Sequence, residues 1–327
     1  MKAALYDRYG PAGEVLRIED VERPEPGPGE VRVRVEFSGV NPTDWKSRSG
    51  ATPRPIDGFQ IPHHDGAGVI DAVGADVDPG RVGQRVWLWM AAAGRPWGTA
   101  AEWTVVPVYA AVPLPDGVSA ELGASLGVPA VTAHRCLFAD GPVDGQTVLV
   151  AGGAGAVGHF AIELAKRAGA RVISTVSGPQ KAELAAKAGA DLVVNYREPD
   201  AADQIMSFAG AAGVDRVVEV ALGANLQLDL AVVARPDARI VCYAAEVDDP
   251  VLPVRACMNA NVLFRFVLLY GVPAEALIQA AGDITDALQD GALTELPVSR
   301  FPLDEIVAAQ DAVEAGAVGK VLVDITG

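Results

Sequence analysis

The feature that most constrains this chain is a glycine-rich turn that joins a buried strand to a helix. Thr147–Ala151 is apolar without polar alternation, as expected for a strand covered on both faces of a parallel sheet. The next residues, Gly152–Gly158, contain three glycines in the spacing G-x-G-x-x-G, and a helical pattern follows directly. Such glycines allow a tight turn, a close approach of the backbone to a pyrophosphate, and close packing of the helix on the strand. The dinucleotide-binding residues predicted from this motif are Gly153, Gly155, Ala156, Val157 and Gly158.

Strands and helices alternate from Thr147 to about residue 245. Short apolar segments recur with helical segments between them. Right-handed crossovers between parallel strands arrange such units as a doubly wound α/β sheet. The further strands predicted for this sheet are Arg171–Thr175, Leu192–Asn195, Arg216–Val220 and Arg239–Tyr243.

The first 120 residues have a different pattern, that of a β-rich domain. Val31, Val33 and Val35 alternate with polar residues, and this period of two marks a half-buried strand. Glycine and proline separate the later strands, which favours a compact, barrel-like arrangement. After residue 295 a strand, an amphipathic helix and a final strand are expected to rejoin this domain and make it discontinuous. The predicted elements are Gly68–Val73, Arg85–Trp89, Ala101–Pro107, Leu296–Pro302, Leu303–Ala315 and Lys320–Ile325.

The end of the second parallel strand bears on the choice of dinucleotide. NAD enzymes usually place an acidic residue there, and Thr175–Gly178 contains none. Ser177 can donate a hydrogen bond to a 2′-phosphate, and Lys181 can supply positive charge. These residues therefore favour NADPH. The alternative is that Ser177 caps a helix and Lys181 is a solvated helix residue.

Net charge and cysteine content limit which binding partners and which cellular compartment we expect. The formal net charge of −16 disfavours nucleic acid and anionic membrane surfaces as partners. Cys136, Cys242 and Cys257 form no metal-ligand pattern, and a sparse, odd set suits a reducing compartment. The start of the chain lacks the apolar core of a signal peptide, and no segment is long and apolar enough to span a bilayer. We therefore expect a cytoplasmic protein without a membrane partner.

Several motifs together resemble the quinone oxidoreductase (ζ-crystallin-like) branch of the medium-chain dehydrogenase/reductase superfamily, over nearly the whole chain. The resemblance implies a Rossmann NADPH-binding domain at residues 121–267 and a discontinuous GroES-like β-barrel domain at residues 1–120 and 268–327. It also implies NADPH-dependent hydride transfer to a quinone. The motifs are Pro24–Glu30 with Val31–Val35, Gly39–Asp44, Asp65–Ile70, Gly83–Val86, Ala151–Gly158, Asn195–Glu198 and Gly319–Val321.

The zinc ligands of related dehydrogenases are missing. Zinc-dependent relatives have a Cys where this chain has Asn41, a His at the position of His64, and a further ligand near Gly127–Thr132. A catalytic zinc needs three protein ligands, so one remaining His does not make a site. We expect no metal, with His64 as a pocket or structural residue.

In the branch without zinc, the resemblance places Asn41 against the nicotinamide, where it can hydrogen-bond a substrate carbonyl, with Asp44 shaping the same wall. Thr132 matches a residue near the nicotinamide. Tyr196 matches one that flanks the adenosine, and Lys320 matches a basic residue near the 2′-phosphate. The structural alternatives are turn capping by Asn41 and Asp44, a core threonine, a surface tyrosine and a strand-end lysine.

One departure from the family concerns the substrate pocket. Quinone reductases of this branch carry tyrosines that align with Lys46 and Thr52, next to Trp45. This puts aromatic stacking on a flat quinone in doubt while leaving the hydride chemistry intact. Lys46 is either a proton donor to the developing oxyanion or a solvated lysine.

Two other functions stay open. One is reduction of a conjugated carbonyl by an enoyl or alkenal reductase of the same fold. The other is an NADPH-binding protein with a structural or regulatory role and no turnover.

Val262–Tyr270 is predicted as an apolar edge strand of the cofactor domain. Exposed edges of that kind are usually paired or covered, which favours a homodimer.

Overall fold

The computed structural model describes residues 1–233, 236–245 and 250–326, and divides into two compact units. The first comprises Met1–Val128, Ala281–Gln289 and Glu295–Gly327, and the second comprises Pro129–Ala280 and Asp290–Thr294. The divisions after residues 128 and 280 fall inside two long helices, α3 (Ala120–Phe138) and α9 (Ala274–Gln289). They differ from the predicted boundaries after residues 120 and 267, which fall at the start of α3 and just after the strand Leu263–Phe266.

The first unit is built on a seven-stranded sheet in the order β14-β15-β3-β4-β5-β7, with β6 also paired to β3. A separate pair, β1 and β2, bears the N-terminus, and the helices α1, α2 and α10 belong to this unit. The strands are β1 (Lys2–Leu5), β2 (Arg17–Asp20), β3 (Glu30–Val40), β4 (Asp65–Val73), β5 (Arg85–Leu88), β6 (Trp103–Pro107), β7 (Ala111–Pro113), β14 (Val298–Pro302) and β15 (Lys320–Asp324), and the helices are α1 (Ala12–Val15), α2 (Pro42–Ser49) and α10 (Ile306–Glu314).

Strand β3 organises this sheet because it pairs with three others. Val31, Val33 and Val35 are buried, and Arg34 is exposed, as the period of two predicts. Arg32 departs from the pattern: it is only 6% exposed, with Nε 2.8 Å from Asp71 Oδ1 and Nη1 2.7 Å from Glu25 Oε1. Its guanidinium is buried because two carboxylates accept its hydrogen bonds.

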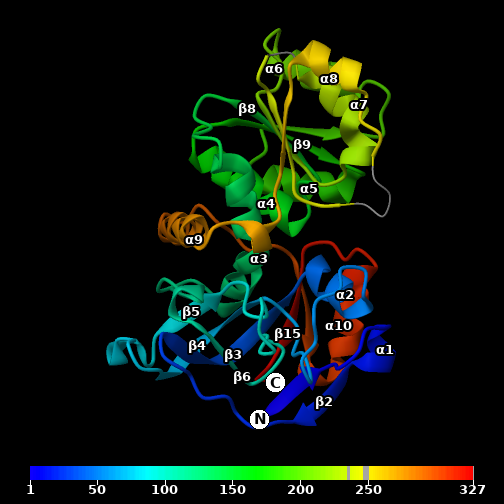
Figure 1. The fold of residues 1–327 in the computed structure, drawn as a ribbon. Helices are drawn as coiled ribbons and strands as arrows, with labels where there is room; N and C mark the ends of the chain where they lie inside the picture. Colours follow the sequence, from blue (N-terminus) through cyan, green and yellow to red (C-terminus); the bar gives the residue numbers. More distant parts are fainter. Residues whose placement is uncertain (234–235, 246–249, 327) are drawn as a thin grey trace. The chain divides into compact units, whose positions relative to one another are not determined.

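The C-terminal segment rejoins the first sheet, as predicted. Strand β15 pairs antiparallel with β3, with Val321 opposite Val40, and β14 pairs parallel with β15. Figure 1 shows this red C-terminal strand beside the blue β3. The predicted helix Leu303–Ala315 is a short 3₁₀ turn, Leu303–Glu305, followed by α10, which packs on α2 and β15. The discontinuous β domain is confirmed, and its closure brings Lys320 to the strand that precedes Asn41.

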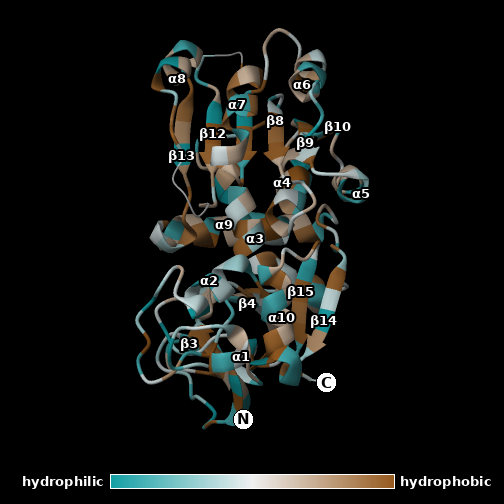
Figure 2. Ribbon diagram, turned by 90° about the vertical axis from the view of Figure 1, so that its right-hand side faces the viewer, coloured by the Kyte–Doolittle hydropathy of each residue, from teal (hydrophilic) through white to brown (hydrophobic). Residues whose placement is uncertain are grey.

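The second unit contains a six-stranded, wholly parallel sheet in the order β10-β9-β8-β11-β12-β13. This is the doubly wound order 3-2-1-4-5-6, in which the strand sequence reverses between β8 and β11. Helices α6 and α7 share a hydrophobic core with β8, β9, β11 and β12. In Figure 2 the strands are largely hydrophobic, whereas α5 is mostly hydrophilic. The elements are β8 (Thr147–Ala151), α4 (Ala156–Arg167), β9 (Arg171–Val176), α5 (Pro179–Lys187), β10 (Leu192–Asn195), α6 (Ala201–Ala209), β11 (Arg216–Glu219), α7 (Leu222–Val232), β12 (Arg239–Cys242), α8 (Val254–Ala260) and β13 (Leu263–Phe266).

Strand β13 forms the edge of this sheet beside β12. It is shorter than the predicted Val262–Tyr270, because the chain turns into a 3₁₀ helix at Leu269–Gly271. Phe266 and Leu268 are 67% and 68% exposed. The edge position is confirmed: Leu263 and Phe266 of β13 are exposed, whereas Phe264 packs against the hydrophobic core. Among the described residues, no helix has the length and apolar character needed to cross a bilayer.

Candidate functional site

The glycine turn after β8 has the geometry that its sequence predicts. A Cβ on Gly158 would lie 2.4 Å from the Gly152 carbonyl oxygen, and one on Gly153 would lie 2.0 Å from Ser174 Oγ. Both positions therefore require glycine. Gly155 is exposed, and a Cβ there would meet only the Gly152 oxygen at 3.4 Å. The backbone at Gly155 and the start of α4, with Ala156 and Val157 half-buried, form an accessible cradle that fits a pyrophosphate.

Three adjacent strands end beside this cradle. The Gly152 N–H donates to the Thr175 carbonyl at 3.0 Å, and the Tyr196 N–H donates to the Val176 carbonyl at 3.1 Å. Ser177, half-buried, and Tyr196, 41% exposed, thus follow β9 and β10 at the same carboxyl edge as the glycine turn. Ser177 is not the helix cap that the structural alternative proposes, because Gly178 occupies the N-cap of α5.

The two other predicted cofactor residues of the second unit lie on helices. Lys181 is exposed in the first turn of α5, four residues after Ser177. Thr132 is 6% exposed in α3, three residues after the Pro129 within that helix. The structure therefore brings the glycine turn, Ser177 and Tyr196 together at one sheet edge, with Lys181 on the adjoining helix.

In the first unit, Asn41 and Asp44 begin α2. Asp44 Oδ2 accepts the Asn41 backbone N–H at 2.7 Å, and both side chains are 3% exposed. Burial, with the nearby Asp65 carboxylate, raises the pKa of Asp44 to about 8, against the Asn41 N–H that lowers it. Asp44 is therefore the N3 residue of a capping box at the start of α2, whose N-cap is Asn41.

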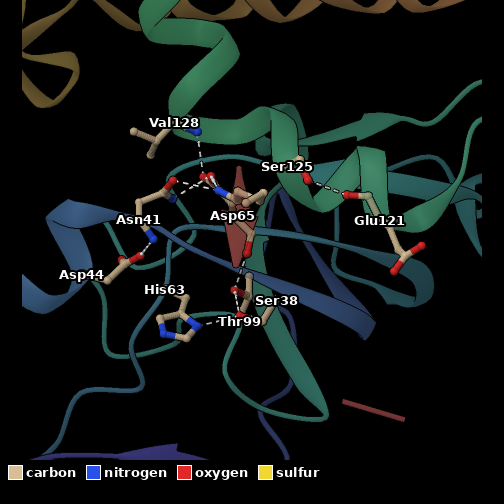
Figure 3. Close-up of polar contacts among 10 residues, drawn as sticks. Ser38, Asn41, Asp44, His63, Asp65, Thr99, Glu121, Ser125 and Val128 are labelled. Carbon is tan, nitrogen blue, oxygen red and sulfur yellow. Dashed lines mark hydrogen bonds and ion pairs between the residues drawn. The ribbon is translucent and has the colours of Figure 1, made fainter. Parts of the chain in front are cut away.

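The side chain of Asn41 lies in a buried polar network that the sequence motifs did not reveal. Its Nδ2 donates to Asp65 Oδ2 at 2.7 Å, and its Oδ1 accepts from Lys320 Nζ at 2.8 Å. Lys320 Nζ also lies 3.2 Å from Asp65 Oδ2, and Asp65 Oδ1 accepts the Val128 N–H at 2.7 Å. Figure 3 shows Asp65 between Asn41 and Val128. The prediction places Lys320 near a 2′-phosphate. In the structure its ammonium is paired with Asp65, because that buried carboxylate requires a counter-charge.

Two glycines make room for this network. A Cβ on Gly127 would lie 2.0 Å from Asp65 Oδ1. A Cβ on Gly39 would lie 2.1 Å from the Ala124 carbonyl oxygen and 3.1 Å from Lys320 Cε. Glycine at these two positions therefore allows Asp65 and Lys320 to be seated against α3 and β3.

A second chain of buried hydrogen bonds ends at the backbone carbonyl of Asp65. Gln310 Nε2 donates to His63 Nε2 at 3.2 Å, and His63 Nδ1 lies 2.8 Å from Ser38 Oγ. Ser38 Oγ lies 2.7 Å from Thr99 Oγ1, which donates to the Asp65 carbonyl at 2.5 Å. Because the Gln310 amide nitrogen can only donate, His63 is protonated on Nδ1. Burial lowers the pKa of His63 to about 3, so the chain carries a neutral imidazole.

The remaining predicted pocket residues are His64, Trp45, Lys46 and Thr52. His64 is 3% exposed, and its Nε2 accepts from Arg54 Nη1 at 3.0 Å. Trp45 and Lys46 are half-buried, with Lys46 Nζ 5.8 Å from the centre of the Trp45 ring. Thr52 is exposed and its N–H donates to the Lys46 carbonyl at 3.0 Å. Trp45 and Lys46 thus lie within α2, and Thr52 lies just beyond its C-terminal end, bonded to Lys46.

The residues at the zinc position of related dehydrogenases do not fit a metal ion. Asn41 Oδ1 accepts a hydrogen bond from the Lys320 ammonium and His64 Nε2 accepts one from the Arg54 guanidinium, so a cationic group already contacts each of these atoms. Residues 127–132 contain no Cys, His, Asp or Glu to supply another ligand. Within the part of the chain that the structure describes, no group of three such side chains is arranged to hold a metal.

A pair of carboxyl groups lies at the carboxyl end of β11, beside the point where the strand order reverses. Glu219 and Asp229, 0% and 1% exposed, share a hydrogen bond, and Asn225 Nδ2 donates to Glu219 Oε1 at 2.9 Å. Burial and the facing Glu219 carboxylate raise the pKa of Asp229 to about 9. At neutral pH this pair therefore retains a proton that an exposed pair would lose.

This pair predicts a pH-dependent stability. An unfolded Asp titrates near pH ~3.9 and folded Asp229 near 9, so folding takes up a proton between these values and stability falls as pH rises. Asp229→Asn keeps a neutral donor toward Glu219 and does not titrate. We expect urea unfolding to show that the variant's gain in stability over wild type is larger at pH 8 than at pH 5, by up to ~4 kcal/mol for one proton over three pH units. The exposed Asp286→Asn should show no such pH-dependent gain, and an equal gain at both values would contradict the shared proton.

Two family models match the chain: the alcohol dehydrogenase GroES-like domain over residues 27–116 and the zinc-binding dehydrogenase over residues 156–283. The human quinone oxidoreductase is 28% identical over 326 residues, covering 98% of this chain and 97% of that protein. A mycobacterial quinone oxidoreductase structure is 32% identical with a TM-score of 0.84, covering 99% of this chain and 100% of the other.

Two further structures are similar over 99% of this chain. A mycobacterial protein complexed with NADPH is 31% identical with a TM-score of 0.85, and all of it is covered. The CurK enoyl reductase is 26% identical with a TM-score of 0.84, and 98% of it is covered. With a GroES-like domain, a doubly wound sheet and these full-length relatives, the chain belongs to the quinone oxidoreductase branch of the medium-chain dehydrogenase/reductase superfamily.

Proposed function

We propose that this protein is an NADPH-dependent oxidoreductase that delivers a hydride to a quinone without a catalytic zinc. The observation that carries the proposal is the cradle at Gly153–Gly158, where two glycines are required for packing and Gly155 is exposed for a pyrophosphate. Ser177 and Lys181 follow the neighbouring strand β9. The residues at its end, Thr175–Gly178, include no acidic residue that would bind a ribose hydroxyl or repel a 2′-phosphate. A relative solved with NADPH and relatives named quinone oxidoreductase support the cofactor and the acceptor.

Asn41 is the group that we assign to the reacting carbonyl. Bound NADPH supplies the hydride, and negative charge then develops on the oxygen of the acceptor. A donor held in place before the reaction stabilises such a charge. One N–H of the Asn41 amide donates to Asp65, and the second is the donor that the acceptor oxygen needs. We assign Thr132 and Tyr196 to the nicotinamide and adenosine ends, and Trp45, Lys46, Thr52 and His64 to the pocket wall.

Reduction of a conjugated carbonyl is the second candidate. It is favoured by the similarity to an enoyl reductase, and by Lys46 and Thr52 standing where quinone reductases of this branch have tyrosines. Hydride transfer to the β-carbon of an enone also places charge on the carbonyl oxygen, so Asn41 serves both reactions. A protein that binds NADPH without turnover is the alternative of another class.

One assay separates these three functions. Purified protein, with its zinc content measured, is mixed with NADPH and either a benzoquinone or naphthoquinone series or an enone series, and absorbance at 340 nm is followed. We expect quinone-dependent oxidation that EDTA does not inhibit. Turnover confined to enones would establish the second function, and NADPH binding with no acceptor-dependent oxidation would establish the third.

Lys181 tests the cofactor preference. Because it is exposed, its contact with a 2′-phosphate is screened by solvent, and we expect Lys181→Ala to raise the KM for NADPH about fivefold. The KM for NADH should not change, since NADH lacks that phosphate. Lys187→Ala, on the last turn of the same helix, is the matched control. Equal effects on both cofactors would remove Lys181 from the phosphate site.

We also propose a cytoplasmic homodimer with no nucleic-acid partner. The sparse, odd set of Cys136, Cys242 and Cys257 suits a reducing compartment, and the net charge of −16 repels phosphate backbones. Among the described strands, none pairs with the outer edge of β13, and we assign the dimer surface to this edge because an exposed apolar edge is normally covered. We expect sedimentation to give a dimer for the wild type and for Tyr109→Glu, an exposed aromatic in the first unit. Phe266→Glu should give a monomer, and a dimer would move the interface elsewhere.

A further inference from the structure

The proposed function assigns no role to Lys320. It begins β15 and is 2% exposed, and its Nζ lies 2.8 Å from Asn41 Oδ1 and 3.2 Å from Asp65 Oδ2. Burying an ammonium and a carboxylate is costly unless each is paired, and apolar side chains of the same volume would often stabilise a fold as well. A role in holding Asn41 accounts for a charged pair at this point.

The pair fixes which way the Asn41 carboxamide faces. The oxygen and nitrogen of an amide are similar in size, so an unrestrained Asn can rotate by a half-turn and exchange them. Here the rotated amide would set its oxygen against the Asp65 carboxylate and its NH₂ against the Lys320 ammonium. Both contacts would be repulsive, so only one orientation is compatible with both neighbours.

The same contacts make Asn41 a better donor. An ammonium that donates to the amide oxygen draws electron density from the amide nitrogen, and hydrogen bonds in series strengthen one another in a buried site. One N–H is committed to Asp65. The second N–H is the one that the proposed function assigns to the acceptor oxygen, and its polarity depends on Lys320.

We propose that Lys320, with Asp65, is a positioning residue that orients and polarises the Asn41 amide for the developing oxyanion. The inference rests on the proposed function and adds to it a charged group behind the donor. The backbone around the Lys320–Asp65 ion pair leaves room for both side chains. Glycine at positions 39 and 127 leaves the space that Lys320 Cε and Asp65 Oδ1 occupy.

The test is a cycle built from two changes. Lys320→Met with Asp65→Asn removes both charges together, so neither is left uncompensated, and the new amide still accepts the Val128 N–H. We expect this variant to lose about tenfold in kcat, with the KM for NADPH and its binding by fluorescence within twofold of wild type. Combined with Asn41→Ala, it should cause no further loss of kcat, since Lys320 and Asp65 act only through Asn41.

Three results would overturn the proposal. An unchanged kcat would mean that the ion pair serves folding alone. A tenfold loss that persists in the Asn41→Ala background would mean that Lys320 acts independently of Asn41. A raised KM for NADPH with that for NADH unchanged would return Lys320 to the 2′-phosphate.

A measurement on the wild-type protein does not depend on whether a variant folds. With ¹⁵N-labelled asparagine, the two side-chain N–H signals of Asn41 should be widely separated and exchange slowly with solvent, because one donates to a buried carboxylate. Signals at the positions of a free amide would contradict the fixed orientation. If wild-type protein turns over no acceptor, the proposed function fails. If it turns over and only Asn41→Ala lowers kcat, the function stands and the role of Lys320 fails.

Discussion

Replacing Asn41 with Ala is expected to lower kcat for the best acceptor about a hundredfold, the usual loss when one preorganised donor to an oxyanion is removed. NADPH affinity should stay within twofold of wild type, since we assign the pyrophosphate to the Gly153–Gly158 turn, which does not include Asn41. Steady-state kinetics with NADPH saturating, together with a fluorescence titration of NADPH, separates the two quantities. The loss should be in kcat because the amide interacts with charge that exists only as the hydride is transferred.

The control for this change is another side-chain amide. Gln204 lies on α6 and donates to Asp200 Oδ1 at 3.0 Å on the surface, so Gln204→Ala should keep the kinetics of the wild type. If Asn41→Ala keeps its kcat, Asn41 is no more than the first residue of a helix cap. A rise in the KM for NADPH alone would place Asn41 in cofactor binding.

The second large effect is expected at the glycine turn. Gly158→Val would place a Cβ 2.4 Å from the Gly152 oxygen and 2.8 Å from the Gly153 Cα, closer than such atoms approach in proteins. The turn must open, so NADPH binding should be lost and the midpoint of thermal unfolding should fall. Titration calorimetry and a thermal melt measure the two effects.

Two other glycines make this test specific. Gly155→Ala has room in the free protein, so it should melt like the wild type while binding NADPH about tenfold more weakly, because the methyl group meets the pyrophosphate. Gly178→Ala, with no atom within 4 Å of its Cβ and no left-handed φ, should change neither property. Full NADPH affinity in Gly158→Val would show that the cofactor binds elsewhere.

Local sequence predicted the parallel sheet closely because each strand carries its own signal. Thr147–Ala151 and Leu192–Asn195 were bounded by glycine, charge and helix periodicity, and the structure places β8 and β10 at these residues. The sequence also predicts that the C-terminal segment rejoins the β domain, although it does not name β3 as the partner strand. The edge strand β13 came out shorter than its apolar run, because apolar character does not distinguish a strand from the 3₁₀ turn that follows it.

The buried network around Asn41 could not be read in the same way. Its members come from the N-cap of α2, from β4, from α3 and from β15, and no spacing rule connects Asp65 with a lysine 255 residues later. Sequence similarity placed Lys320 beside a phosphate, whereas its actual neighbours are set by tertiary pairing of β15 with β3. The one local signal was glycine at 39 and 127, which marks close approach without naming what approaches.

The central claim is that this chain binds NADPH at the Gly153–Gly158 turn and reduces an acceptor without zinc. The most direct measurement is acceptor-dependent NADPH oxidation by protein treated with EDTA and shown by elemental analysis to hold far less than one zinc per chain. We predict full turnover, with Gly158→Val inactive beside it. Activity that disappears with the metal and returns when zinc is restored would contradict the account.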